Sequence, residues 1–265
     1  MKPLFLIAAT LTIASATLLA GPESIRADKN VMATPAPAEM CNWSGFYVGG
    51  DVGGAFDRAE FDLNLTGAWE SFPEPSDETF GERLGSRDLD ANGLVAGAFL
   101  GYNFQWNNWV IGVEAGCDFV GLRDSFNSGL EFVSPGTGDA FVVRQSFKTH
   151  YRATVGPRIG YAFNRVLLYA TGGLALGDME VAQEIREPFF GFREEGSTDD
   201  SEIGWMVGGG LEYCLARHWS IRAEYRYTDF ESFDFSSRGN DPTFTGHHDV
   251  DLRYHSVTAG LAFRF

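Results

Sequence analysis

Apolar and polar residues alternate with a period of two along most of the chain from Phe46 to Phe265. The clearest stretch runs from Trp219 to Thr228, where aromatic and aliphatic side chains alternate with Ser, Arg, Glu and Thr. A helix would place its apolar residues three and four positions apart, which is not the spacing seen here. The pattern therefore predicts strands that each have one apolar face and one polar face.

Eight segments with this alternation predict eight strands, an even number, as single-chain bacterial barrels require. The parity of the fifth segment stays open because Val166, Leu167 and Leu168 are consecutive. Pro157 interrupts the fourth segment, and since proline cannot donate a ladder hydrogen bond, we expect a β-bulge there. The predicted strands are Phe46–Phe56, Leu94–Trp106, Trp109–Phe119, His150–Phe163, Val166–Gly177, Ile203–Leu215, Trp219–Thr228 and Ser256–Phe265.

The links between these segments alternate between short and long. Asn107-Asn108, Asn164-Arg165 and Ala216-Arg217-His218 predict tight turns, and the links at about 59–91, 122–149, 178–202 and 231–250 predict long loops. Short turns at one end and long loops at the other are typical of outer-membrane barrels, whose short turns are periplasmic. We therefore predict an all-β fold, an eight-stranded antiparallel up-and-down transmembrane β-barrel in the bacterial outer membrane.

The first 42 residues follow a different pattern. The apolar run from Leu4 to Leu19 follows Lys2 and is short for a spanning helix, which needs about 20 residues. It predicts a signal peptide over residues 1–20, although several alanines leave its end open. Residues 21–42 contain three prolines and predict a flexible N-terminal segment, with the barrel at 43–265 and no further domain after it.

Composition fits this fold. The chain has 32 glycines, and 14% of its residues are aromatic. Glycine relieves crowding inside a small barrel, and aromatic side chains form belts where the outer surface meets the lipid headgroups. Tyr102, Tyr161 and Tyr213 each precede a predicted short turn. We expect them at the periplasmic interface, together with Trp109 and Trp219.

Charge patterning predicts a filled lumen. The net charge of −16 argues against binding nucleic acid, whose phosphates it would repel. A charge facing lipid would cost about 2–4 kcal/mol near the midplane, so the charged face must point inward. We expect the inward charges to pair, which leaves the lumen plugged and no wide pore. They are Asp51, Glu114, Asp118, Glu212, Glu224, Arg152, Arg158, Arg222, Arg226 and Arg264.

The predicted loops carry the negative charge. Each of the segments 59–91 and 178–202 contains nine acidic residues against two arginines. Such runs are commonly solvated segments that discourage aggregation. The alternatives are a cation-mediated contact with anionic lipopolysaccharide and a contact with a basic partner.

The three cysteines, Cys41, Cys117 and Cys214, are an odd number for an exported chain. They are far apart and show no metal-binding spacing, so we predict three unpaired thiols. Residues 38–40 do not form a lipid-attachment motif before Cys41.

Two other classes of protein have weak support. A barrel enzyme needs a histidine near a nucleophile or an acid. The candidates are His150, His247, His248 and His255, with Ser256, Asp249 and Asp251 nearby. His255 and Ser256 are adjacent, so they should point to opposite faces of one strand. A soluble lipid-binding barrel is suggested only by Gly67-Ala68-Trp69, which falls in a predicted loop.

Several motifs resemble the small-porin or OmpA-like outer-membrane β-barrel family over residues 43–265. They are the opening segment 43–50 (WSGFYVGG), the hairpin 101–104 and 109–114 (GYNF and WVIGVE), the hairpin 160–163 and 168–175 (GYAF and LYATGGLA), segment 219–225 (WSIRAEY) and the terminal Phe265. The resemblance implies that Phe265 signals to the barrel assembly machinery. It also implies a surface structural protein, a porin, an adhesin or a host-interaction antigen, without choosing among them.

We therefore predict a structural outer-membrane protein with a surface-interaction or envelope-integrity role, which is not an enzyme and needs no cofactor or metal. Its expected partners are outer-membrane lipid and lipopolysaccharide, the assembly machinery through Phe265, and a host or surface ligand. The alternatives are a small-solute diffusion porin and a barrel enzyme acting on lipid.

Overall fold

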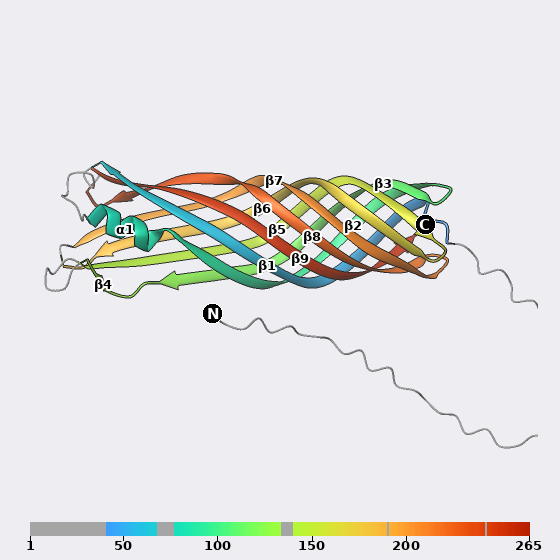
Figure 1. The fold of residues 1–265 in the computed structure, drawn as a ribbon, viewed down its shortest axis with the longest axis horizontal. Helices are drawn as coiled ribbons and strands as arrows, with labels where there is room; N and C mark the ends of the chain where they lie inside the picture. Colours follow the sequence, from blue (N-terminus) through green and yellow to red (C-terminus); the bar gives the residue numbers. More distant parts are fainter. Residues whose placement is uncertain (1–40, 68–76, 134–139, 190, 242) are drawn as a thin grey trace, which may run out of the picture. The chain divides into compact units, whose positions relative to one another are not determined.

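The computed structural model describes residues 41–67, 77–133, 140–189, 191–241 and 243–265. These residues form nine strands and one helix (Figure 1). The predicted signal peptide and nearly all of the predicted N-terminal segment lie outside the described residues. The elements are β1 (Gly45–Gly67), α1 (Asp77–Gly85), β2 (Arg87–Trp106), β3 (Trp109–Asn127), β4 (Glu131–Phe132), β5 (Ala140–Phe163), β6 (Val166–Glu187), β7 (Phe192–Ala216), β8 (Trp219–Gly239) and β9 (Phe244–Arg264).

Eight of the strands form a closed antiparallel ring, which confirms the predicted fold class. Each long strand pairs with its neighbours in sequence, β1 also pairs with β9, and β3 pairs with β5 across the two-residue β4. The strand β4 pairs only with β5. Among the described residues, no helix is both long enough and apolar enough to cross a membrane.

The predicted tight turns all lie at one end of the barrel, which we call the short-turn end. Asn107 and Asn164 adopt φ angles of 54° and 53° in two of these turns, a left-handed conformation that asparagine tolerates better than most residues. Both β1 and β9 reach this end, where the Phe265 N–H donates to the Phe46 carbonyl over 2.9 Å. The opposite end, with the long β-hairpins and α1, is the long-hairpin end (Figure 1).

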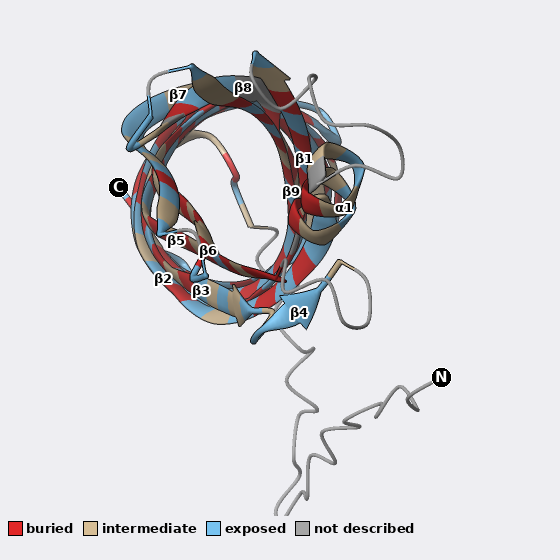
Figure 2. Ribbon diagram, turned by 90° about the vertical axis from the view of Figure 1, so that its left-hand side faces the viewer, coloured by how far each residue is buried: buried red, intermediate tan, exposed pale blue. Residues whose placement is uncertain are grey.

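Next to the short-turn end the strands turn apolar side chains outward. On β7, Ile203, Trp205 and Val207 are 59%, 48% and 48% exposed, whereas the alternate positions face the lumen. Figure 2, viewed from the long-hairpin end, shows buried and exposed residues alternating along the strands. This half of the barrel is the membrane-spanning section. Outward aromatic rings meet at the edge of this section next to the short-turn end, as in the edge-to-face contact of Trp109 with Tyr161 at 5.2 Å.

Beyond the apolar band the strands continue with the opposite polarity. On β6, Val181 and Ile185 are buried inside the barrel, while Glu180 and Glu184 lie on the outer face. The prediction of long loops at 59–91, 122–149, 178–202 and 231–250 is therefore wrong for most of their length, since strands and α1 occupy them. Water surrounds this section, which we call the extension, so its apolar residues pack inward.

The ladder passes Pro157 without a shift of register, so the bulge predicted there is wrong. Gly156 and Gly172 allow β5 and β6 to approach closely at this point, because a Cβ on Gly156 would lie 1.9 Å from the Gly172 carbonyl oxygen. The register of β5 against β6 shifts instead between Thr149 and Tyr151, at His150. This shift lies where the membrane-spanning section meets the extension.

The outward apolar band makes a direct prediction about solubility. We expect the purified protein to fold only in detergent or lipid, because in plain buffer this apolar band would be exposed to water. The folded protein should give a β-type circular dichroism spectrum and a heat-dependent shift of mobility in gels. A helical spectrum, or a monodisperse folded protein in plain buffer, would contradict the barrel.

Candidate functional site

The lumen of the membrane-spanning section holds all ten charged residues that the sequence placed there. Their side chains are at most 8% exposed. Every arginine among them lies within 4.0 Å of at least one of the acids, and every acid has an arginine partner, so the predicted pairing is confirmed. We call this set, contributed by β1, β3, β5, β7, β8 and β9, the charge network.

Arg222 is at the centre of the charge network. Its Nη1 donates to both carboxylate oxygens of Glu114 at 3.0 and 2.9 Å, and its Nη2 donates to Asp51 at 3.0 Å. The guanidinium also lies 3.3 Å from the centre of the Phe99 ring. Glu114 accepts a further bond from the Tyr47 hydroxyl at 2.8 Å. Arg222 thus joins two carboxylates on different strands, and the Phe99 ring lies against one face of its guanidinium.

Arg158 organises the part of the network nearer the short-turn end. Its Nη2 donates to Glu212 at 2.5 Å, and its guanidinium lies 3.6 Å from the centre of the Tyr169 ring. Glu212 also accepts from the Ser220 hydroxyl at 2.6 Å and from Arg264 at 3.0 Å. Glu212 therefore contacts two arginines, and Glu114, 3.4 Å from Arg158, supplies a second negative charge beside that guanidinium.

Two further pairs lie toward the extension. Arg152 donates to Asp118 through Nη2 at 2.5 Å and through Nε at 2.9 Å. Arg226 contacts Glu224, whose other oxygen accepts from the Tyr169 hydroxyl at 2.7 Å. Taking these charges out of water is expensive, and close pairing with several hydrogen bonds offsets that cost.

Glycine makes room for these large side chains, as its abundance in the sequence predicts. A Cβ on Gly49 would lie 2.2 Å from the ring of Phe99, which packs under Arg222. An eight-stranded barrel is just wide enough for its own side chains, so a larger residue at Gly49 would displace the ring. The glycine content is thus linked to the filling of the lumen.

An apolar cluster occupies the lumen at the short-turn end. Trp43 is fully buried, and the guanidinium of Arg264 lies 4.5 Å from its ring centre. The Trp43 backbone N–H donates to the Gln105 side chain over 2.7 Å. The other members of the cluster are Val110, Ala162, Leu167, Tyr169 and Cys214. The chain just before β1 therefore enters the barrel mouth and packs there.

A disulfide between Cys41 and Cys214 ties this N-terminal stretch to β7. The prediction of three unpaired thiols is therefore wrong for two of them, while Cys117 is a free, exposed thiol on β3. The two bonded residues are 173 positions apart in sequence, and nothing in their local pattern pairs them. Only the closing of the barrel, which brings Trp43 into the mouth, places them together.

Apolar layers fill the lumen on the other side of the charge network. A large cluster that includes Phe61, Phe147, Met179 and Phe230 lies in the extension. A second cluster, nearer the long-hairpin end, is formed by Leu63, Leu65, Phe141, Val143 and Ile185, and Phe80 and Leu84 of α1 pack against it.

The helix α1 is fastened to the barrel by polar contacts at both edges of this second cluster. Glu82 accepts from the Leu65 backbone N–H at 3.0 Å, and the Gln145 side chain donates to the Gly85 carbonyl at 2.5 Å. This helix lies within the long loop predicted at 59–91, so the sequence pattern did not indicate it.

The candidate enzymatic residues do not form an accessible site. Ser237 lies 2.6 Å from Nε2 of His248 and 2.5 Å from a carboxylate oxygen of Glu194, a grouping that the local sequence pattern does not indicate. Ser237 and His248 are 0% and 1% exposed, so a substrate has no path to the hydroxyl. Burial, with a contribution from His247, lowers the pKa of His248 to about 4, which keeps its imidazole neutral near pH 7.

Two of the other candidate histidines, His150 and His255, lie apart on the outer wall. His150 is 3.8 Å from Asp178, and His255 contacts the Tyr225 hydroxyl at 2.7 Å. His255 is exposed and Ser256 is buried, so the two do point to opposite faces as predicted. Within the described ranges, no three His, Cys, Asp or Glu side chains are grouped to hold a metal ion.

Comparison with known proteins identifies the family. A family model described as an outer membrane protein beta-barrel domain matches residues 31–265. The chain is 30% identical over 240 residues to a 31 kDa outer-membrane immunogenic protein of Brucella melitensis, covering 88% of each chain. It is 27% identical to a 25 kDa outer-membrane immunogenic protein of Brucella abortus, covering 100% of this chain and 99% of the relative. The chain belongs to the outer membrane protein beta-barrel family.

The structure also aligns with the outer membrane protease OmpT of Escherichia coli, with a TM-score of 0.45 and 11% identity over 83% of this chain and 97% of that one. Membership of the beta-barrel family places the protein in the outer membrane. In such barrels short turns face the periplasm and long connections face the outside. By this rule we expect the disulfide and Trp43 at the periplasmic mouth, and α1 and the extension outside the cell.

Proposed function

We propose that this outer membrane beta-barrel protein is a closed, structural barrel that presents its extracellular extension as an interaction surface. The observation that carries the proposal is the charge network, which occupies the membrane-spanning lumen with five paired arginines. A solute would have to displace side chains that are each held by an opposite charge. The apolar clusters on either side of the network add two further barriers.

The shape of the extracellular part supports the surface role. Paired strands carry the outer wall well past the apolar band, so the exposed face is a stiff sheet with polar side chains at regular spacing. Glu60 on β1 lies directly opposite Asp251 on β9, and Asp62 lies opposite Asp249. Like charges in such positions repel, so cations from the medium would stabilise this wall and could link it to anionic lipopolysaccharide.

Liposome swelling tests the closed barrel against the diffusion-porin alternative. We expect vesicles containing the refolded protein to swell in arabinose no faster than protein-free vesicles, since the lumen is filled. A general porin reconstituted in parallel would show that the vesicles report uptake. Swelling at a rate near that of the porin would overturn the proposal and assign the protein to the diffusion porins.

The terminal strand supports contact with the assembly machinery. Phe265 is 72% exposed on the outer face at the periplasmic end of β9, next to Phe263 at a ring distance of 5.2 Å. An exposed terminal aromatic at this edge is available to a partner before the barrel closes. We propose that this residue is the recognition signal.

Deleting Phe265 is therefore expected to lower the amount of protein in the outer membrane several-fold, while export to the periplasm continues. Quantifying the protein in outer-membrane and periplasmic fractions checks this. Phe265→Tyr is the matched control, because it keeps an aromatic side chain and should restore normal levels. Equal outer-membrane levels of the deleted and full-length chains would contradict the role of Phe265.

A further inference from the structure

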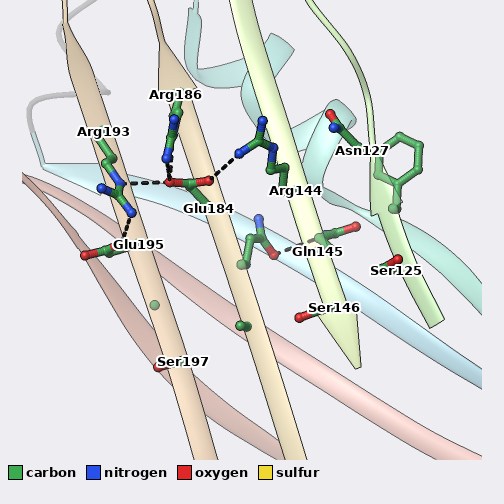
Figure 3. A pocket seen from close by; sticks show the side chains of 14 residues that line it. Ser125, Asn127, Arg144, Gln145, Ser146, Glu184, Arg186, Arg193, Glu195 and Ser197 are labelled. Carbon is green, nitrogen blue, oxygen red and sulfur yellow. Dashed lines mark hydrogen bonds and ion pairs between the residues drawn. The ribbon is translucent and has the colours of Figure 1, made fainter. Parts of the chain in front are cut away.

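The outer wall of the extension is hollowed across β3, β5, β6 and β7. The hollow has a volume of about 700 Å³ and is drawn in Figure 3. Its floor is a row of small side chains that face one another across the four strands, namely Ser125, Ser146, Ala182 and Ser197. The neighbouring row, nearer the long-hairpin end, has longer side chains: Asn127 lies opposite Arg144, and Arg144 lies opposite Glu184. Short residues beside long ones give the wall its concave shape.

Three arginines converge on a single carboxylate at the edge of this hollow (Figure 3). Arg144 Nη1, Arg186 Nη2 and Arg193 Nε lie 3.4, 2.5 and 2.8 Å from the oxygens of Glu184. Burial alone would raise the pKa of Glu184, but the arginines, Arg186 foremost, lower it, so this carboxylate stays ionised. Arg193 also contacts Glu195 at 2.5 Å.

The three arginines have N–H donors that these ion pairs do not use. Among the described ion pairs of this cluster, three guanidinium groups contact the two carboxylates of Glu184 and Glu195, which leaves an excess of positive charge here in a chain of net charge −16. Each guanidinium carries five N–H donors in a fixed fork, a geometry that suits phosphate and carboxylate groups. Arg144 and Arg193 have side chains that are 50% exposed, so an anion can reach them from solvent.

The depth of the hollow relative to the membrane limits what it meets. Ala182 in its floor lies six residues past Leu176, the last large apolar residue exposed on β6. At about 3.3 Å per residue and a tilt near 40°, the floor is roughly 15 Å beyond the hydrocarbon edge. Sugars, rather than lipid chains, surround an outer-membrane protein at that height.

We propose that this hollow binds an anionic sugar, whose phosphate or carboxylate is held by Arg144, Arg186 and Arg193 and whose hydroxyls face the floor serines and Asn127. The inference rests on the surface role proposed above and names a ligand class for it. A volume of about 700 Å³ accommodates one or two sugar rings, and hydroxyl and amide groups beside the arginines provide the neutral hydrogen bonds that a bare anion would not need. Either the core sugars of neighbouring lipopolysaccharide or a free acidic glycan has this chemistry.

Binding measurements on the refolded full chain in detergent test the inference. The probes are lipopolysaccharide with a complete core, lipid A without core sugars, and a soluble heparin hexasaccharide. Arg144→Gln combined with Arg193→Gln should weaken binding of the complete lipopolysaccharide about tenfold and leave lipid A binding unchanged, since lipid A does not reach the hollow. If the substitutions weaken only hexasaccharide binding, the hollow still binds an anionic sugar and its source is a free glycan.

Two further variants separate a binding site from a merely structural cluster. Arg253→Gln is the matched control, because Arg253 is 48% exposed on the β9 wall and pairs with Asp229 at 3.6 Å, yet lies outside the hollow. Its affinity should equal that of the wild type. Glu195→Gln removes a competing carboxylate from Arg193 and should strengthen binding several-fold, whereas a structural role would weaken or not change it.

The inference is overturned if the double variant binds every probe as tightly as Arg253→Gln does, or if no probe binds the wild type. A heat-dependent gel shift of each variant shows that the barrel is folded. Failure here would leave the closed lumen intact, because liposome swelling tests that property without the hollow.

Discussion

Replacing Arg222 by alanine is expected to lower the free energy of unfolding by about 3–5 kcal/mol, the usual cost of breaking a buried ion pair. The substitution removes the guanidinium that bonds both Glu114 and Asp51, and Asp51 loses the arginine that it contacts. Urea unfolding in lipid vesicles, followed by tryptophan fluorescence, measures the change.

A double variant distinguishes lost charge pairing from lost packing. Adding Asp51→Asn to Arg222→Ala should recover part of the stability, because the carboxylate that has lost its arginine becomes neutral. Arg253→Ala on the outer wall is the matched control and should change stability by less than about 1 kcal/mol, as exposed ion pairs do. Equal stability of the wild type and Arg222→Ala would show that the charge network does not hold the barrel together.

Breaking the disulfide is the second large effect that we expect. Cys41→Ser should destabilise the folded barrel by about 4–5 kcal/mol, because the bond closes a loop of 173 residues and so restricts the unfolded chain. It should also loosen Trp43 from the periplasmic mouth, since the tryptophan is two residues from the lost anchor. Urea midpoints of the wild type and the variant, and of the wild type with and without a reductant, give the change.

Cys117 provides the internal control for that experiment. Its thiol is free and exposed on the lipid-facing wall of β3, so Cys117→Ser should unfold at the wild-type midpoint. A reductant should destabilise the wild type and the Cys117→Ser variant equally, and leave Cys41→Ser unchanged. If Cys41→Ser unfolds at the same urea concentration as the wild type, the bond contributes nothing to the barrel.

The membrane-spanning section was predictable because a single rule governs it. Lipid requires apolar side chains outside, so the polar face of each alternating strand must point inward, and all ten charges follow. The eight strands and the three tight turns follow from the same alternation. The pairing of particular residues, such as Arg222 with both Glu114 and Asp51, was not predictable, because it depends on how strands far apart in sequence meet across the lumen.

The extension was missed because the rule reverses there. The strands keep their period of two, but water outside the membrane places apolar residues such as Val181 inside and acids such as Glu180 outside. On β5 the register shift at His150 also changes the parity, so Arg152 and Phe147 both face inward although one position is even and the other odd. The acidic residues of these paired strands therefore led to the prediction of solvated loops.

The remaining surprises depend on contacts between distant parts of the chain. The disulfide joins residues 173 positions apart, and Ser237 reaches Glu194 and His248 on two other strands. Local sequence contains no signal for either, because each requires the closed ring. The glycine and aromatic content indicated a crowded lumen but not which side chains would fill its two ends.

Single-channel recording across a planar bilayer tests the closed lumen most directly. With the refolded wild-type protein inserted, we predict no stable conductance of general-porin size, because paired charges and two apolar clusters occupy the lumen. Insertion is confirmed by recovering the heat-modifiable protein from the membrane. Stable, reproducible steps of general-porin size from the wild-type protein would contradict the account.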